Sequence, residues 1–158
     1  MSNLDRAAAN TTVARAFIAA FDAGDADTLE SLLAEDFVWH TAVINDEETQ
    51  PRPYQSRCLA GLEDVVFGPL RKNKAETSEL FRLLFNPDNG FQFRLRPVTI
   101  TAQDDRVAIE AEGDATNPAN GRRYRNLYFI LMRIREGKVV LYKEYQDTLH
   151  IYDVFVAN

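Results

Sequence analysis

The residue best placed to do chemistry in this sequence is Glu144, which lies among aromatic residues in the C-terminal part of the chain. Side chains alternate between the two faces of a β-strand, so Glu144 shares a face with Tyr142 and Gln146 on a predicted strand. A carboxyl group among aromatic side chains is unfavourable unless it is solvated, paired or functional. We interpret Glu144 as a general acid or base that faces a pocket. The alternative is a solvated residue at a sheet edge, paired with a lysine or arginine of a neighbouring strand.

Groups that could assist Glu144 lie on one face of another predicted strand, which carries Tyr124, Asn126 and Tyr128. A tyrosine hydroxyl can donate a hydrogen bond to a developing oxyanion, and Asn126 could support it. Aromatic neighbours would shield the Glu144 carboxyl from water and raise its pKa, which suits acid–base chemistry near neutral pH. The predicted catalytic residues are Glu144, Tyr128 and Asn126.

Other residues on the predicted strands are candidates for contact with a substrate. Trp39 and Thr41 share one face of a strand, and His40 lies on the opposite face. Glu110 and Glu112 share the charged face of a later strand, where the alternative is a hairpin that simply faces water. The predicted substrate-binding residues are Trp39, Thr41, Tyr124, Tyr142, Glu110 and Glu112.

The residue types that usually bind transition metals are few and widely spaced. His40, His150 and the single cysteine, Cys58, show no recognisable ligand spacing, so we predict no metal site. The alternative is coordination by the carboxylates of Glu110 and Glu112 alone. We expect His40 at a surface or an interface, whereas His150 follows the last strand and could reach the mouth of a pocket.

The elements that would position these residues begin with two helices. The first has an apolar stripe at helical spacing, a cap at Asn10 or Thr11 and an end at Gly24. Capping-box spacing between Asp27 and Glu30 predicts the start of the second. We expect the following elements next: a strand over 37–43, a polar loop over 45–56, an amphipathic helix over 62–70 and a short helix over 75–85.

From residue 91 onward the hydrophobic pattern changes to a period of two, which predicts strands. We expect strands over 92–102, 106–115, 124–136 and 138–148, followed by a tail over 149–158 that forms a helical turn or two. Helices followed by an antiparallel meander indicate the α+β class, and 158 residues fit one domain. Apolar side chains on both faces over 127–131 predict a homodimer, because a monomer seldom exposes a large apolar sheet face.

Composition excludes several classes of partner. A net charge of −6 disfavours nucleic acid, and no apolar run approaches the roughly 20 residues that span a bilayer. The polar, Ala-rich segment over 1–10 shows no secretory signal. A single cysteine cannot form an internal disulfide, which fits a reducing compartment. We therefore predict a cytoplasmic protein with no membrane and no nucleic-acid partner.

Motifs at both ends of the chain carry a resemblance to a known family. The N-terminal motifs are Val13–Phe17, Phe21–Asp25 and Leu32–Trp39, and the C-terminal ones are Gly121, Tyr124, Asn126, Tyr128, Glu136–Val139 and Lys143–Thr148. Together they resemble the SnoaL-like branch of the nuclear transport factor 2-like superfamily, which includes ketosteroid isomerase-like and polyketide cyclase-like proteins. The segment over about 44–89 matches poorly, and we interpret it as an insertion placed like a lid.

The resemblance implies an α+β fold: a cone-shaped barrel of a strongly bent, mainly antiparallel sheet wrapped on N-terminal helices. It also implies dimerisation through the outer sheet face and an acidic residue inside the cone that works without metal or organic cofactor. Glu144 falls where limonene epoxide hydrolase has its catalytic aspartate, and Trp39 and Thr41 fall where that enzyme holds its water. The Arg-x-Asp pair of that enzyme would lie near 110–112, where no arginine stands.

These observations favour a cofactor-independent enzyme whose cone encloses a small, mostly apolar molecule. The expected chemistry is isomerisation, cyclisation or dehydration of an apolar carbonyl or polycyclic substrate, because these reactions need one positioned acid and a hydrogen-bond donor in an apolar pocket. The alternatives are a non-catalytic small-ligand-binding or accessory module, an epoxide hydrolase, and a purely structural dimer, because this fold hosts many functions.

Overall fold

The computed structural model describes residues 3–41, 54–55, 66–67 and 71–156. The helices are α1 (Asn3–Ala23), α2 (Ala26–Leu32), α3 (Lys74–Leu84) and α4 (Thr148–Phe155), with a 3-10 turn at Pro87–Asn89. The strands are β1 (Leu33–Thr41), β2 (Tyr54–Gln55), β3 (Val66–Phe67), β4 (Arg71–Asn73), β5 (Phe93–Gln103), β6 (Arg106–Thr116), β7 (Arg123–Arg135) and β8 (Lys138–Gln146). In this described part of the chain, no helix is long and apolar enough to cross a membrane.

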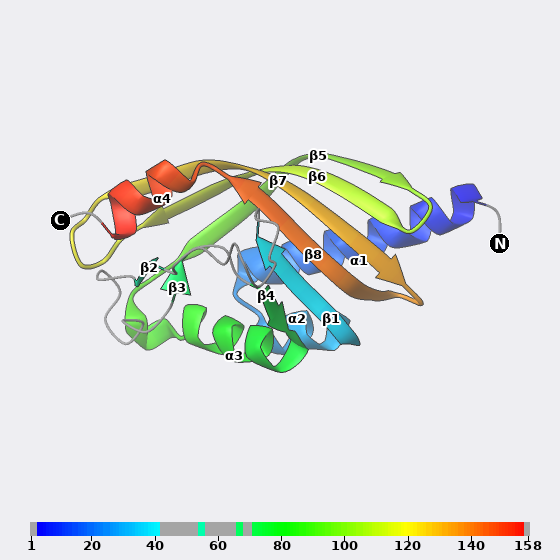
Figure 1. The fold of residues 1–158 in the computed structure, drawn as a ribbon, viewed down its shortest axis with the longest axis horizontal. Coiled ribbons are helices and arrows are strands. Elements are labelled where there is room, and N and C mark those ends of the chain that lie inside the picture. The colour runs from blue at the N-terminus through cyan, green and yellow to red at the C-terminus, as the bar shows by residue number, and fades with distance from the viewer. Residues whose placement is uncertain (1–2, 42–53, 56–65, 68–70, 157–158) are drawn as a thin grey trace, which may run out of the picture.

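Six strands form one bent, open sheet in the order β4-β1-β8-β7-β6-β5. β1 runs parallel to β8, and the other neighbours are antiparallel. The long strands β5 to β8 arch over α1, while α3 lies below and α4 covers one end (Figure 1). β2 and β3 pair with each other in a separate ribbon. Helices and a curved sheet therefore enclose a common interior, as expected for a cone of the α+β class.

Burial alternates strictly along β7, and this alternation identifies the inner face of the sheet. Tyr124, Tyr128 and Ile130 are buried, whereas Leu127 and Phe129 between them are exposed. An alternation of this kind arises when one face of a sheet is covered and the other is open. The inner face packs on α1, and the outer face of the described residues is exposed.

Two of the predicted helix caps are wrong. α1 begins at Asn3, so Asn10 lies inside the helix, where it is buried and its Nδ2 donates to the carbonyl oxygen of Asp104 at 2.8 Å. The preceding residues include three alanines, which favour continuation of a helix. α2 is capped by Asp25, which accepts from the backbone N–H of Thr28, and not by Asp27. Gly24 between the two helices has φ of +70°, as expected for a helix C-terminal glycine.

The four long strands and the helix over 75–85 are confirmed to within two residues at each end. Other expectations need correction. Tyr54 and Gln55 form β2 instead of belonging to a loop, and Val66 and Phe67 form β3 instead of a helix. Short apolar runs do not distinguish strand from helix by periodicity alone, which explains the second error. The remainder of the predicted loop and helix lies outside the described residues. β1 begins at Leu33, four residues before the predicted start of this strand.

Candidate functional site

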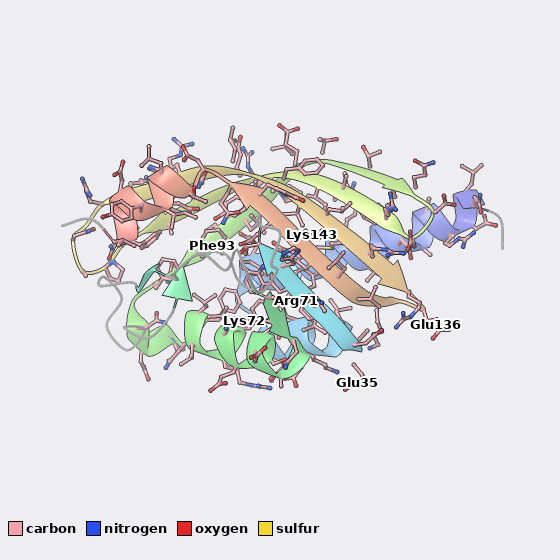
Figure 2. The ribbon with its side chains drawn as sticks, viewed as in Figure 1. Glu35, Arg71, Lys72, Phe93, Glu136 and Lys143 are labelled. Carbon is pink, nitrogen blue, oxygen red and sulfur yellow. The ribbon has the colours of Figure 1, made fainter. Side chains whose placement is uncertain are left out.

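A cavity of about 120 Å³ lies between the inner face of the sheet and helices α1, α3 and α4. Its lining is mostly aromatic and aliphatic, and includes Phe21, Leu80, Phe85, Phe91, Leu95 and Phe155. Phe93, labelled in Figure 2, projects from β5 into this interior. Pockets for small organic molecules are typically concave and apolar with a few polar groups. This cavity has that composition, and its polar groups come from β1, β7 and β8.

Among the described residues that line the cavity, Glu144 is the one that carries a full charge when ionised. It lies on β8 between Thr41 of β1 and Ile130 of β7, which are its partners in the sheet register. The Tyr142 hydroxyl hydrogen-bonds to its carboxyl, and Gln146 Nε2 donates to Glu144 Oε1 through a long bond of 3.5 Å. Burial raises the pKa of Glu144 to about 7, because removal of water disfavours the charged form more than these two hydrogen bonds favour it.

Two tyrosine hydroxyls meet on the lining of the same cavity. The hydroxyl oxygens of Tyr124 and Tyr128 lie 2.5 Å apart, and Asn126 Nδ2 donates to the Tyr124 hydroxyl at 2.9 Å. Burial raises the pKa of Tyr124 to about 12 and holds the pKa of Tyr128 well above its usual range. A negative charge on Glu144 raises both pKa values further. Both hydroxyls therefore remain protonated at neutral pH and can serve as hydrogen-bond donors.

The structure brings most of the predicted site residues together. The residues that line the cavity beside Glu144 are Trp39, Thr41, Tyr124, Tyr128 and Tyr142. Trp39, Tyr128 and Glu144 therefore line the same cavity. Asn126 does not line the cavity. It is buried behind Tyr124, where its Nδ2 also donates to the carbonyl oxygen of Asp147 at 2.9 Å and so connects β7 to the end of β8.

Glu110 and Glu112 lie on the opposite face of the sheet from the cavity. Ala111 between them is fully buried and pairs with Tyr128, so its two neighbours point outward. Glu110 is exposed, and Glu112 forms an ion pair with Arg96. This placement corrects the expectation that these two acids contact a substrate inside the cone, and it agrees with the alternative of a hairpin that faces water.

The two histidines also lie outside the cavity lining. His40 occupies β1 between the inward-facing Trp39 and Thr41, so it projects from the other face. His150 stacks on the ring of Tyr124 at a centroid distance of 5.4 Å, and its Nε2 accepts from the backbone N–H of Arg125 at 3.2 Å. The described residues contain no group of three or more His, Cys, Asp or Glu side chains that could hold a metal ion.

Several residues of the site carry no clear signal in the sequence. Gln146 lies on the face of Glu144, so strand alternation places it correctly but predicts no role for it. Leu80 and Phe85 reach the cavity from α3, and Ile151 and Phe155 reach it from α4. No local pattern distinguishes these residues from ordinary core residues, because helix packing against a distant sheet decides which of them line the cavity.

The fold and the acidic cavity define a known class of protein. The sequence profile of the SnoaL-like domain matches residues 14–142, so the chain belongs to the SnoaL-like domain family. This match confirms the resemblance seen in the N-terminal and C-terminal motifs. No curated protein sequence matches the chain at a significant level.

Solved structures with the same fold include proteins of different function. An NTF2-like protein from Burkholderia xenovorans superposes with a TM-score of 0.66 and 20% identity, over 94% of this chain and 97% of that protein. TerC, co-crystallised with polyporic acid, has a TM-score of 0.67 and 20% identity, over 92% and 97%. An LEH-like epoxide hydrolase from M. tuberculosis has a TM-score of 0.64 and 17% identity, over 95% and 91%. At these identities the likeness shows the cone-shaped α+β fold.

Proposed function

We propose that this protein is a cofactor-independent enzyme that performs acid–base chemistry on a small apolar carbonyl compound. The observation that carries the proposal is the carboxyl group of Glu144, which lies in an apolar cavity and has a pKa raised to about 7. The hydroxyls of Tyr124 and Tyr128 line the same cavity. A general acid or base works best when its pKa lies near the operating pH. The small-molecule ligand of TerC, which has the same fold, supports a binding role for the cone.

The proposed reaction starts with the ionised Glu144 and a carbonyl group that accepts a hydrogen bond from the Tyr128 hydroxyl. Glu144 removes a proton from the carbon next to the carbonyl, and the electron pair of that C–H bond moves onto the carbonyl oxygen. Tyr128 stabilises the resulting enolate as donor, and Tyr124 holds Tyr128 through the 2.5 Å contact between their hydroxyls. The Tyr128 hydroxyl is already in place before the reaction, so the site needs little rearrangement when negative charge develops on the enolate oxygen.

The fate of the enolate determines the overall reaction. Return of the proton from Glu144 to a different carbon gives an isomerisation. Departure of a β-hydroxyl group, which takes the proton from Glu144 and leaves as water, gives a dehydration. Attack of the enolate carbon on a second carbonyl within the same molecule, with the proton delivered to the new alkoxide, gives a cyclisation. All three reactions need the same groups and no other reactant.

Glu144→Gln tests the proposal. Glutamine keeps the volume and can accept from the Tyr142 hydroxyl, but it cannot exchange a proton. A positioned acid or base typically contributes about 100- to 10,000-fold to a rate, so turnover should fall by that factor. The substrates to screen are apolar ketones, epoxides and aromatic polyketides. Glu79→Gln, an exposed carboxyl on α3, is the matched control and should retain full turnover. Full activity in Glu144→Gln would eliminate Glu144 as the catalytic residue.

The same experiment separates an enzyme from a non-catalytic binding module. A binding module shows no turnover of any screened compound in the wild type, while its ligand still changes the fluorescence of Trp39, the single tryptophan of the chain.

Epoxide hydrolysis is the less favoured reaction. Glu112 and the neighbouring Arg96 lie on the outer face of the sheet, where they cannot assist Glu144 in positioning water.

We also propose that two copies of the chain associate through the outer sheet face. Leu127 is 67% exposed, and Phe129 and Tyr145 beside it are 51% and 43% exposed. The rings of Phe129 and Tyr145 lie 6.4 Å apart, so these side chains form one apolar surface. A monomer seldom leaves such a surface uncovered. We separately propose a cytoplasmic location, because the single cysteine, Cys58, cannot form an internal disulfide.

A further inference from the structure

Two polar atoms of residues that line the cavity have no hydrogen-bond partner among the described residues. They are the indole nitrogen Nε1 of Trp39, whose residue is only 8% exposed, and the amide oxygen Oε1 of Gln146. A buried polar group without a partner is unfavourable, and native proteins contain few of them. Trp39 Nε1 can only donate, and Gln146 Oε1 can only accept. A ligand with one acceptor and one donor would satisfy both atoms.

The positions of these residues place the two atoms toward opposite ends of the site. Trp39 pairs with Tyr142 in the sheet register, and Gln146 lies four residues further along β8, with Glu144 between them. Four residues of a strand span about 13 Å along the backbone. The Gln146 amide turns back along this distance toward Glu144, with its Nε2 3.5 Å from Glu144 Oε1. A ligand that reaches from Trp39 toward Gln146 therefore lies across the Glu144 carboxyl, with its acceptor and its donor at opposite ends.

The volume and the charge of the cavity limit the ligand further. An engineered cavity of about 150 Å³ holds one benzene molecule, so a cavity of about 120 Å³ has the size of a single ring. Phe93 and Ile151 are only partly buried, so the cavity opens to the surface and leaves room for substituents on that ring. Within the described part of the chain, no lysine or arginine lines this cavity, and Glu144 does, so an anionic ligand would lack a partner and be repelled.

We propose that the substrate of this site is a neutral, single-ring compound with a hydrogen-bond acceptor at one end, bound by Trp39, and a donor at the other, bound by Gln146. This inference rests on the proposed function, because it assigns the ligand of the same cavity. It narrows the substrate to one ring. The acceptor bound by Trp39 is a second polar group, distinct from the reacting carbonyl that Tyr128 holds next to its register partner Gln146. Aromatic residues on both sides of the cavity favour a planar ring.

Equilibrium binding of five probe compounds to the wild-type protein tests this inference. The probes are para-hydroxyacetophenone, acetophenone, ethylbenzene, para-hydroxybenzoate and a two-ring acetylnaphthol. Para-hydroxyacetophenone should bind about tenfold more tightly than acetophenone, and acetophenone about tenfold more tightly than ethylbenzene, because each step removes one hydrogen bond to a buried group. The anion and the two-ring compound should bind more weakly than para-hydroxyacetophenone. Equal affinity of all five probes, or a preference for the anion or the larger ring system, would overturn the inference.

NMR provides a second measurement that needs no variant. The chain has one tryptophan, so its indole N–H gives a single signal. This signal should move downfield when acetophenone or para-hydroxyacetophenone binds, because the ketone oxygen accepts from Trp39 Nε1, and should not do so with ethylbenzene. A saturated ketone complex in which the signal shows no downfield movement would contradict the role of Trp39.

A pair of variants tests the other end of the ligand. Gln146→Leu keeps the approximate size but removes the acceptor, so it should abolish the tenfold advantage of para-hydroxyacetophenone over acetophenone. Gln103→Leu, at the exposed end of β5, makes the same change outside the cavity and should leave that advantage intact. An undiminished advantage in a folded Gln146→Leu would overturn the role of Gln146. These measurements involve no turnover, so the inference and the proposed acid–base function can fail independently.

Discussion

The stability of this protein should depend on pH through Glu144. Burial raises the pKa of its carboxyl from the ordinary value of 4.5 to about 7 in the folded protein. Between these two pH values the folded protein binds one more proton than the unfolded chain, so the free energy of unfolding falls as the pH rises. The penalty is absent below about pH 4.5 and complete above about pH 7. A difference of about 2.5 pKa units, at about 1.36 kcal/mol per unit, corresponds to about 3 kcal/mol.

Glu144→Gln should remove this penalty. The glutamine cannot ionise, and its carbonyl oxygen can still accept from the Tyr142 hydroxyl. The variant should therefore match the wild type near pH 4.5 and be more stable by up to about 3 kcal/mol at about pH 8. For a chain of this length that gain raises the midpoint of thermal unfolding by about 6–12 °C. The figure is an upper limit, because Glu144 keeps part of its solvent exposure and the opening of the cavity admits water.

Thermal unfolding of both proteins at a series of pH values between about 4.5 and 8.5 measures the effect. Glu79→Gln on the exposed face of α3 removes the same charge without changing the cavity, so its difference from the wild type should stay small throughout. The reasoning is refuted if the gap between Glu144→Gln and the wild type is constant over this range. It is also refuted if the variant is the less stable protein at about pH 8, because that result requires a buried cation that holds the carboxylate.

Three further predictions concern other parts of the molecule. Phe129→Arg on the outer sheet face should convert a dimer into a folded monomer, measured by sedimentation; a wild type that is already monomeric at micromolar concentration contradicts the proposed association. Gly113→Ala should lower the free energy of unfolding by about 1–3 kcal/mol in urea titrations, because the added Cβ would lie 2.6 Å from Tyr128 Cε2 and 2.9 Å from Phe93 Cζ; an unchanged midpoint would show that these rings move freely. Treatment with a chelator should leave turnover unchanged, and a loss restored by a divalent ion would reveal a carboxylate-bound metal.

The sequence predicts which side chains of a long strand share a face, because side-chain alternation is a local property of the backbone. Alternation combined with aromatic neighbours predicts a pocket-facing position for Glu144, Tyr128 and Trp39, and an apolar stripe at helical spacing predicts the buried face of α1 with Phe17 and Phe21. Local patterns are less informative where two structures share one signal. A short apolar run around 66 fits a helix as well as a strand, and a polar residue such as the one at 10 fits a cap as well as a buried contact.

Tertiary structure alone decides which of the two faces of the strand Arg106–Thr116 meets the cavity. The sequence shows that Glu110 and Glu112 share a face, but the pairing of Ala111 with Tyr128 turns that face outward. The parallel alignment of β1 with β8, which sets Thr41 beside Glu144, joins residues about a hundred positions apart in the chain. Periodicity reports only on neighbours within one element, whereas the cavity, its volume and the raised pKa of Glu144 arise from packing between elements that are distant in sequence.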